Sequence, residues 1–284
     1  MTEPSRNIAD SNTDFYDEED VIARYELEQG WNDPGEMSVL LSIASAVRGK
    51  PILDIGIGTG RTTPLLRLLT DDYVGIDYAA NMVKAAKSAF PGVDLRVGDV
   101  RDLRDFEDGS KELVLFSYNG LDSIDHEFRA ASLANMARVV APGGYLVYST
   151  LNLESPWARR RPWTLPERPA GRGLEGLASW AARLAQWALR LPSNMQNLRR
   201  SQALRKQGLG WATEPGPGTR WRAVFHFTTV AQEKADLAAT GLQLERVITR
   251  DGVDITDQNS TDAIFFYRLF ELNRAVPVQG CRRV

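Results

Sequence analysis

The chain has 284 residues, of which 43% are hydrophobic and 25% charged, a composition typical of a globular protein with a sizeable core. Its single cysteine, Cys281, excludes an intramolecular disulfide framework, and two histidines leave little for a zinc site, so we expect no catalytic metal. Residues 1–20 lack the apolar segment of a secretion signal and no apolar run reaches transmembrane length, which predicts a cytoplasmic protein.

Charge is distributed unevenly along the chain. Residues 1–37 contain eleven acidic and two basic residues, whereas residues 151–225 contain thirteen basic and four acidic residues. The basic segment also holds six of the seven tryptophans, which are Trp157, Trp163, Trp180, Trp187, Trp211 and Trp221. Composition therefore marks 151–225 as a separate insertion. Residues 1–13 are polar and are expected to be disordered.

Apolar residues at near-helical spacing predict two helices before the first strand, one within Phe15–Tyr25 and one over Glu36–Val47, separated by the break at Pro34-Gly35. From there, short apolar strands alternate with amphipathic helices. The predicted strands are Ile52–Ile55, Tyr73–Asp77, Val93–Val97, Glu112–Tyr118 and Tyr145–Thr150, and the predicted helices are Thr62–Leu69, Met82–Phe90 and His126–Val140. This alternation predicts a parallel sheet with right-handed crossovers.

The regular alternation stops at Leu151. Within the insertion, apolar residues from Leu174 to Leu191 share one helical face, and Pro192 is expected to end that helix. The pattern resumes after Phe225 with a helix over Val230–Thr240, stopped by Gly241, and with strands over Leu242–Ile248 and Ala263–Phe270. The tail, residues 273–284, has no periodicity.

A glycine-rich turn follows the first strand, with Gly56, Gly58 and Gly60 at every second position. Glycine permits positive φ angles and lets a ligand lie against bare backbone, and the helix beyond it offers unpaired N–H groups. Asp77 ends the next strand, where one carboxylate can accept hydrogen bonds from both ribose hydroxyls. A dinucleotide-binding turn needs glycine or alanine where this chain has Arg61 or Thr63, which disfavours a dehydrogenase.

Several motifs in one order resemble a class I S-adenosylmethionine-dependent methyltransferase: the glycines after Asp54, Asp77 after the second strand, Asp99 after the third, and Pro142-Gly143-Gly144 before the fifth. The resemblance covers roughly residues 15–150 and 226–270. It implies an α/β, Rossmann-like fold with a seven-stranded, mostly parallel sheet, an antiparallel last strand and helices on both faces. We expect residues 14–150 and 226–272 to form this domain, and residues 151–225 to form a helical cap.

The resemblance also assigns cofactor contacts. It implies that Asp54 faces the ammonium group of S-adenosylmethionine, that Asp99 accepts from the adenine amino group unless it is only a turn residue, and that Tyr78 and Val100 sandwich the adenine. Tyr16 and Tyr25 are expected to cover the ligand. The full set of expected contacts is Tyr16, Tyr25, Asp54, Gly56, Gly58, Gly60, Asp77, Tyr78, Met82, Asp99, Val100, Tyr118 and Asn119.

A hydroxyl acceptor needs a base to remove its proton, and His226, His126 and Asp122 are the candidates. Each also has a structural interpretation, as a packed or capping His226, a solvated helix terminus at His126 and a loop or cap acid at Asp122. Ser117-Tyr-Asn-Gly120 lacks the tetrapeptide of amino-directed nucleic-acid methylases. The leading prediction is a small, partly apolar acceptor methylated at oxygen, with nitrogen and carbon left open.

The basic insertion has three interpretations. It is a lid over the acceptor pocket, a helix that lies on a membrane surface with its tryptophans in the interface, or a packing surface between subunits. A nucleic-acid partner is not expected, because the core is acidic and no RNA-binding module is recognisable. Two alternative functions remain: a methyltransferase that acts on a macromolecule or a lipid-like acceptor through this segment, and a non-catalytic binding protein.

Overall fold

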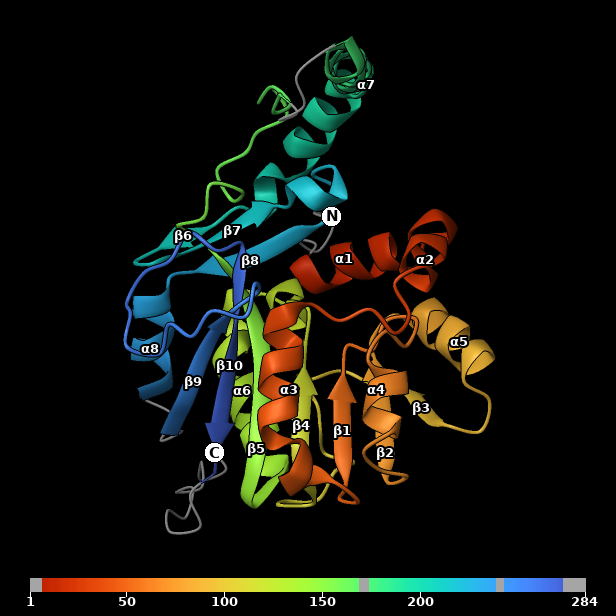
Figure 1. The fold of residues 1–284 in the computed structure, drawn as a ribbon, viewed down its shortest axis with the longest axis vertical. Helices are drawn as coiled ribbons and strands as arrows, with labels where there is room; N and C mark the ends of the chain where they lie inside the picture. Colours follow the sequence, from red (N-terminus) through yellow and green to blue (C-terminus); the bar gives the residue numbers. More distant parts are fainter. Residues whose placement is uncertain (1–6, 169–173, 239–242, 273–284) are drawn as a thin grey trace, which may run out of the picture.

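The apolar runs between Ile52 and Asn152 form five parallel strands in the computed structural model, which describes residues 7–168, 174–238 and 243–272 (Figure 1). Their order is β3-β2-β1-β4-β5. The strands are β1 (Ile52–Ile55), β2 (Tyr73–Asp77), β3 (Asp94–Val97), β4 (Lys111–Phe116) and β5 (Val140–Asn152). β1 is buried along its whole length, as expected for a central strand covered on both faces.

Two further strands complete the predicted seven. β10 (Phe265–Glu271) runs antiparallel to β5, and β9 (Gln243–Thr249) runs antiparallel to β10. The mostly parallel sheet with an antiparallel last strand is therefore confirmed. Pro142-Gly143-Gly144 lies inside β5 rather than before it, and the pairing of β5 with β4 shifts register there, between Lys111 and Leu113.

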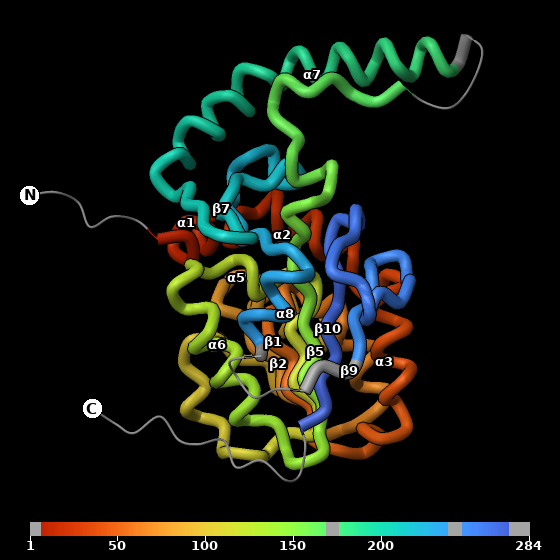
Figure 2. The backbone as a smooth tube through the Cα atoms, turned by 90° about the vertical axis from the view of Figure 1, so that its left-hand side faces the viewer, coloured from red at the N-terminus to blue at the C-terminus, as the bar shows by residue number. Residues whose placement is uncertain are grey.

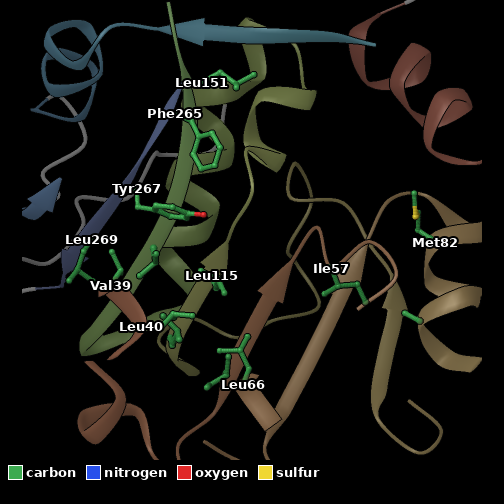
Figure 3. Close-up of a cluster of buried hydrophobic side chains, with 14 of the residues drawn as sticks. Val39, Leu40, Ile57, Leu66, Met82, Leu115, Leu151, Phe265, Tyr267 and Leu269 are labelled. Atoms are coloured by element: carbon green, nitrogen blue, oxygen red, sulfur yellow. The ribbon is translucent and has the colours of Figure 1, made fainter. Parts of the chain in front are cut away.

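Helices cover both faces of the sheet (Figure 1). On one face, α3 (Pro34–Val47), α4 (Thr63–Arg67) and α5 (Ala80–Ala89) contribute to a core cluster that includes Leu40, Leu66 and Tyr267 (Figure 3). On the other face, α6 (His126–Val139) and α8 (Val230–Ala238) contribute Leu133, Met136 and Leu237 to a second cluster. Gly241, the expected stop of α8, lies outside the described residues.

The first described residues are ordered, contrary to the disorder expected through Thr13. They form α1 (Ile8–Tyr16), followed by α2 (Glu19–Glu26), so the single predicted helix is two helices. Ile8 is buried, and its backbone N–H donates to the Asp125 carboxylate at 3.1 and 3.2 Å. Asn12 is fully buried and exchanges two hydrogen bonds with the backbone of Val224. These buried contacts fix α1 despite its polar composition.

The insertion is not only helical, which corrects the sequence prediction. It carries β6 (Gln207–Gly208), β7 (Trp211–Pro215) and the first two residues of β8 (Val224–Thr228), and short helical turns η2 (Ser201–Leu204) and η3 (Pro217–Thr219). β8 pairs in parallel with the end of β5, at Leu151 and Asn152, and antiparallel with β7. These strands extend the sheet beyond the end of β4, above the turn η1 (Gly120–Ser123), because β5 is long enough to reach past its neighbour.

The long helix of the insertion, α7 (Leu174–Arg200), continues through Pro192, where the sequence predicted its end. Proline removes one intrahelical hydrogen bond, a local cost that neighbouring contacts can offset. Here the helix beyond the proline is anchored, because Asn194 and Leu198 are buried and Asn197 donates to the Arg220 carbonyl at 3.0 Å. Among the described helices, none combines enough length and hydrophobicity to cross a bilayer.

Candidate active site

The loops that follow β1, β2 and β4 meet at the carboxyl edge of the sheet and line a cavity. Ligands of open α/β sheets bind at this edge. We call this space the first cavity. Eight of the thirteen expected cofactor contacts line it: Tyr16, Tyr25, Gly56, Gly58, Asp77, Tyr78, Met82 and Tyr118. Residues as distant in sequence as α1 and β4 thus converge on the glycine turn.

The glycine turn presents bare backbone to the first cavity. Gly56 and Gly58 have φ angles of +68° and +55°, which favour glycine. A Cβ at Gly56 would lie 2.5 Å from the Phe116 ring, so no other residue fits there without movement. A Cβ at Gly58 would project into open space, with the Tyr25 ring at 3.8 Å as its nearest neighbour. The backbone at Gly58 is therefore free for close contact with a ligand.

Asp77 closes this turn onto β2. Its two carboxylate oxygens accept the backbone N–H groups of Gly58 at 2.8 Å and Ala79 at 2.9 Å. Burial raises the pKa of Asp77 to about 6, an effect that the two N–H donors partly offset. Asp77 is therefore mainly a carboxylate at neutral pH, and it can accept hydrogen bonds from hydroxyl groups of a molecule bound in the cavity. Nearby, the Tyr78 hydroxyl is buried without a hydrogen-bond partner in the described structure, which leaves a donor for a ligand.

A buried ion pair that the sequence analysis did not single out supports the turn. Arg61, directly after Gly60, donates to both carboxylate oxygens of Glu36 at 2.6 and 2.8 Å and to the Ser117 hydroxyl at 3.1 Å. Both side chains are almost completely buried. Burial alone would lower the pKa of Arg61, but the contact with Glu36 outweighs this effect and raises that pKa above its ordinary value. The pair joins α3, the glycine turn and the end of β4. The sequence signal for this pair was the charge of Arg61 directly after the apolar and glycine residues of the turn.

A second, larger cavity adjoins the first and shares Tyr16, Tyr25 and Tyr118 with it. Its remaining walls combine apolar surfaces with polar and charged groups. Leu151, Trp157, Phe225, Ile264 and Phe265 contribute these apolar surfaces. Because Trp157, Gly218, Thr219 and Phe225 belong to the insertion, this segment forms part of the wall, whereas none of the described side chains of α7 lines it.

Three charged side chains also line the second cavity: Arg24 and Glu28 near α2, and Arg250 after β9. The guanidinium of Arg250 lies 5.6 Å from the Phe265 ring and 5.9 Å from the Trp31 ring, which fixes its position. One carboxylate oxygen of Glu28, Oε2, is buried without a hydrogen-bond partner in the described residues. A buried carboxylate oxygen that lacks a donor is an acceptor available to a bound molecule.

Tyr118 and Asn119 stand at the junction of the two cavities in strained backbone. Both adopt left-handed conformations, with φ angles of 53° and 64°. The Arg61 guanidinium lies 4.8 Å from the Tyr118 ring centre, and the Asn119 N–H donates to the Ser149 hydroxyl at 2.7 Å. Asn119 lines the second cavity, and its backbone carbonyl accepts from Asp122 within the turn η1. Its Oδ1 is buried without a partner in the described structure.

The structure brings the two histidines together, but away from both cavities. His126 Nδ1 lies 3.0 Å from His226 Nε2, and the His126 ring stacks on Trp211 at 3.6 Å. His226 is only 1% exposed, and its neighbours on β8, Phe225 and Phe227, point to the opposite face of the sheet. Burial and the nearby Arg129 charge lower the pKa of His226 well below its usual value, so the ring is neutral.

Asp122 belongs to a buried network rather than to either cavity lining. Its carboxylate accepts from Arg129 Nη1 at 2.6 Å, from the Thr150 hydroxyl at 2.8 Å and from the Leu151 N–H at 2.6 Å. Arg129 also contacts Glu233 at 3.1 Å. Burial raises the pKa of Asp122 to about 7, while these donors hold it down. The network ties η1, α6, β5 and α8 together beneath the site.

The comparisons with known proteins agree with this geometry. Residues 52–144 match the methyltransferase domain family. This segment contains the glycine turn, Asp77 and the end of β4. Over this segment the chain is similar to S-adenosylmethionine-dependent methyltransferases.

Curated relatives are similar over part of their length. A demethylmenaquinone methyltransferase from Renibacterium salmoninarum is 31% identical over 133 residues, which is 45% of this chain and 54% of the relative. A ubiquinone biosynthesis O-methyltransferase from Bordetella bronchiseptica is 26% identical over 125 residues, 42% of this chain and 50% of the relative. The chain thus spans about half the length of the curated relatives it matches.

Solved structures show the same fold. An S-adenosylmethionine-dependent methyltransferase from Mesorhizobium loti has a TM-score of 0.51 and 17% identity, and the match covers 82% of this chain and 97% of that one. The CcbJ methyltransferase from Streptomyces caelestis has a TM-score of 0.52 and 14% identity, with 95% and 100% covered.

The remaining residues that the family resemblance proposed as cofactor contacts lie outside the first cavity lining. Asp54 is buried beneath the turn, where it accepts from Thr62 at 2.6 Å and Tyr73 at 2.9 Å, and burial raises its pKa to about 7. A Cβ at Gly60 would meet the Phe90 ring at 2.5 Å. Asp99 is held by the Arg101 guanidinium at 2.6 to 3.0 Å, and Val100 packs in the opposite core cluster.

Proposed function

We propose that this protein transfers a methyl group from S-adenosylmethionine to a small, partly apolar acceptor, at a hydroxyl oxygen. The observation that carries the proposal is the pair of adjoining cavities that share Tyr16, Tyr25 and Tyr118. The first has bare glycine backbone and a carboxylate, as a nucleoside-bearing cofactor requires, and the second combines aromatic and aliphatic walls with three charged side chains that could orient a small molecule.

In the first cavity, Asp77 would hold the ribose hydroxyls, and the open backbone at Gly58 would lie against the rest of S-adenosylmethionine. The Tyr78 hydroxyl, which lacks a partner, offers a further polar contact. The bound cofactor supplies an electrophilic methyl group on a sulfonium sulfur.

In the second cavity, we propose a flat, lipophilic acceptor that carries an ionisable hydroxyl, such as a substituted phenol or quinol. Trp157, Phe225 and Phe265 offer aromatic surfaces for its ring, and Arg24 and Arg250 offer positive charge for an acidic substituent or a developing oxyanion. The names of the relatives from Renibacterium salmoninarum and Bordetella bronchiseptica, which refer to menaquinone and ubiquinone, support a lipophilic acceptor.

We assign the base to Glu28 rather than to His226, His126 or Asp122. Glu28 lines the second cavity and has a buried oxygen without a donor, whereas the other three side chains line neither cavity. In the proposed step, the acceptor hydroxyl gives its proton to Glu28 while its oxygen forms a bond to the methyl carbon. The carbon–sulfur bond breaks and its electron pair returns to sulfur. Alignment and the exclusion of water by the cavity walls supply much of the remaining rate enhancement.

Calorimetry and a transfer assay test the proposal together. We expect titration with S-adenosylhomocysteine to give saturable one-to-one binding, and incubation with S-adenosylmethionine labelled in its methyl group to label phenolic or quinol acceptors. Absence of binding would contradict the cofactor assignment. Binding without transfer to any member of an oxygen, nitrogen and carbon acceptor panel would favour a non-catalytic binding protein.

A further inference from the structure

The part of α7 before Pro192 and the segment 155–168 form an arm that projects away from the sheet (Figures 1 and 2). α7 has 27 residues, so it is about 40 Å long. The arm is held together from within, because Trp187 Nε1 donates to the Pro162 carbonyl at 2.9 Å and the Arg168 guanidinium lies 5.7 Å from the Trp180 ring. It continues into the second cavity wall, since Trp157 lies at its base.

The outward face of this arm is apolar although nothing in the described structure covers it. Of the side chains described before Pro192 in α7, none is buried. Those around Leu177 and Leu189, which are 47% and 83% exposed, fall on one face whose other described side chains are alanines. The exposed members of this face are Leu177, Ala178, Ala181, Ala182, Ala185, Ala188 and Leu189. A helix with apolar residues on its inner and outer sides is normally buried, so this face requires a partner.

The flanks of the arm are strongly basic. Residues 155–200 include eight arginines with described side chains, whereas Glu167 is the acidic residue described among them. Arg183 and Arg190 lie on the polar side of α7 opposite this face, together with Ser179 and Gln186, and Trp163 and Leu165 add further exposed apolar surface, at 55% and 61%. An apolar face on one side of a helix and arginines on its polar side, accompanied by tryptophans, is the pattern of a helix that lies in a membrane interface.

We propose that the arm docks on the surface of an anionic lipid bilayer, with Leu177 and Leu189 inserted at the headgroup boundary. Charge decides between this partner and a second copy of the chain. The net positive charge of the arm is attracted to anionic headgroups, whereas two arms, both positively charged, would repel one another. Docking would also bring the second cavity, which shares Trp157 with the base of the arm, close to the lipid phase from which a lipophilic molecule enters.

Vesicle co-sedimentation of the full chain tests this inference without any activity measurement, so its outcome is independent of the proposed methyl transfer. Vesicles of phosphatidylcholine mixed with phosphatidylglycerol should bind the protein, and vesicles of phosphatidylcholine alone should bind it several-fold more weakly. High salt should reduce binding to the mixed vesicles. The double substitution Leu177→Glu and Leu189→Glu should weaken that binding about tenfold or more, because two inserted apolar side chains are lost.

The matched control is the double substitution Leu41→Glu and Leu68→Glu. It changes the net charge by the same amount at two leucines on the surface outside the arm, which are 65% and 75% exposed. It should bind mixed vesicles like the wild type, and both double variants should keep the wild-type melting temperature. Equal loss in the two variants, unchanged binding in the arm variant, or no vesicle binding at all would overturn the inference. A dimer in solution that only the arm variant dissociates would also overturn it, by assigning the face to a second copy.

Discussion

The two cavities of the site share three tyrosines but are built from different materials. The first is walled by a backbone turn whose glycines have positive φ angles and by one carboxylate, Asp77, that the turn itself holds. The second is walled by side chains from α1, α2, the segment after β4, β5, the insertion and β10, with three charges among aromatic rings. The first cavity therefore includes main chain among its walls, beside several side chains, whereas side chains from separate elements form most of the second.

This difference predicts which amino-acid substitutions each cavity tolerates. A Cβ at Gly56 would meet a ring at 2.5 Å, and the Glu36–Arg61 pair behind the turn is buried, so substitutions at the first cavity disturb the fold and the ligand together. Side chains of the second cavity project from separate elements and can be replaced one at a time. We therefore expect substitutions in the second cavity to alter turnover and acceptor choice while cofactor binding persists.

The largest expected effect is at Glu28. Replacing it in Glu28→Gln should lower kcat roughly 10²- to 10⁴-fold, because the acceptor hydroxyl loses its proton acceptor, while the affinity for S-adenosylmethionine stays unchanged. Steady-state kinetics and calorimetry measure the two quantities. Glu26→Gln, an exposed change at the last residue of α2 and two residues before Glu28, is the control and should leave both near wild type. Wild-type kcat in Glu28→Gln would remove Glu28 as the base.

Cofactor affinity should depend on Asp77 far more than on Asp99. Asp77→Ala removes two charge-assisted hydrogen bonds to the ribose, so calorimetry should find S-adenosylhomocysteine bound about 100-fold more weakly. In Asp99→Ala the lost carboxylate was already held by Arg101 and does not line the first cavity, so affinity should fall less than about tenfold. A reversed order would show that the adenine lies over Asp99.

A smaller effect is expected at Arg24. Arg24→Gln removes one of the positive charges in the second cavity, so the KM for an acceptor with an acidic substituent should rise about tenfold, with cofactor affinity unchanged. Arg48→Gln, at an exposed position outside both cavities, serves as the charge-matched control. An equal KM in the two variants would mean that the acceptor does not meet this charge.

The smallest effect concerns stability and falls outside both cavities. The folded protein lowers the pKa of His226, so its contribution to stability is present above the unfolded value of about 6.5 and is lost as pH falls below that value. Urea unfolding should therefore show the wild type losing more stability than His226→Gln, by no more than about 1.4 kcal/mol for each pH unit below 6.5. Parallel pH profiles would contradict a buried, neutral His226.

Sequence reasoning was reliable where structure is set by local pattern. Ile52–Ile55 and Tyr73–Asp77 are the observed strands β1 and β2 residue for residue, because a short apolar run closed by glycine or an acid leaves few alternatives. The glycine turn and Asp77 lie only about twenty residues apart, so their meeting followed from one strand–helix–strand unit.

It was unreliable where long-range contacts decide. The Glu36–Arg61 pair and the second cavity join residues from Tyr16 to Phe265, which no periodicity connects. The strands of the insertion pair with the end of β5, and Pro192 lies inside α7, although propensity alone favours a stop there. His226 was selected for its position, but strand alternation directs its side chain to the face opposite Phe225.

The central claim is that the cofactor occupies the first cavity with its reactive sulfur directed at the second. A crystal structure with S-adenosylhomocysteine tests it most directly. We predict ribose hydroxyls on the Asp77 carboxylate, the ligand along the open backbone at Gly58, and the sulfur beside Tyr118 at the junction of the cavities. A ligand bound elsewhere, or a sulfur that faces away from the second cavity, would contradict the account.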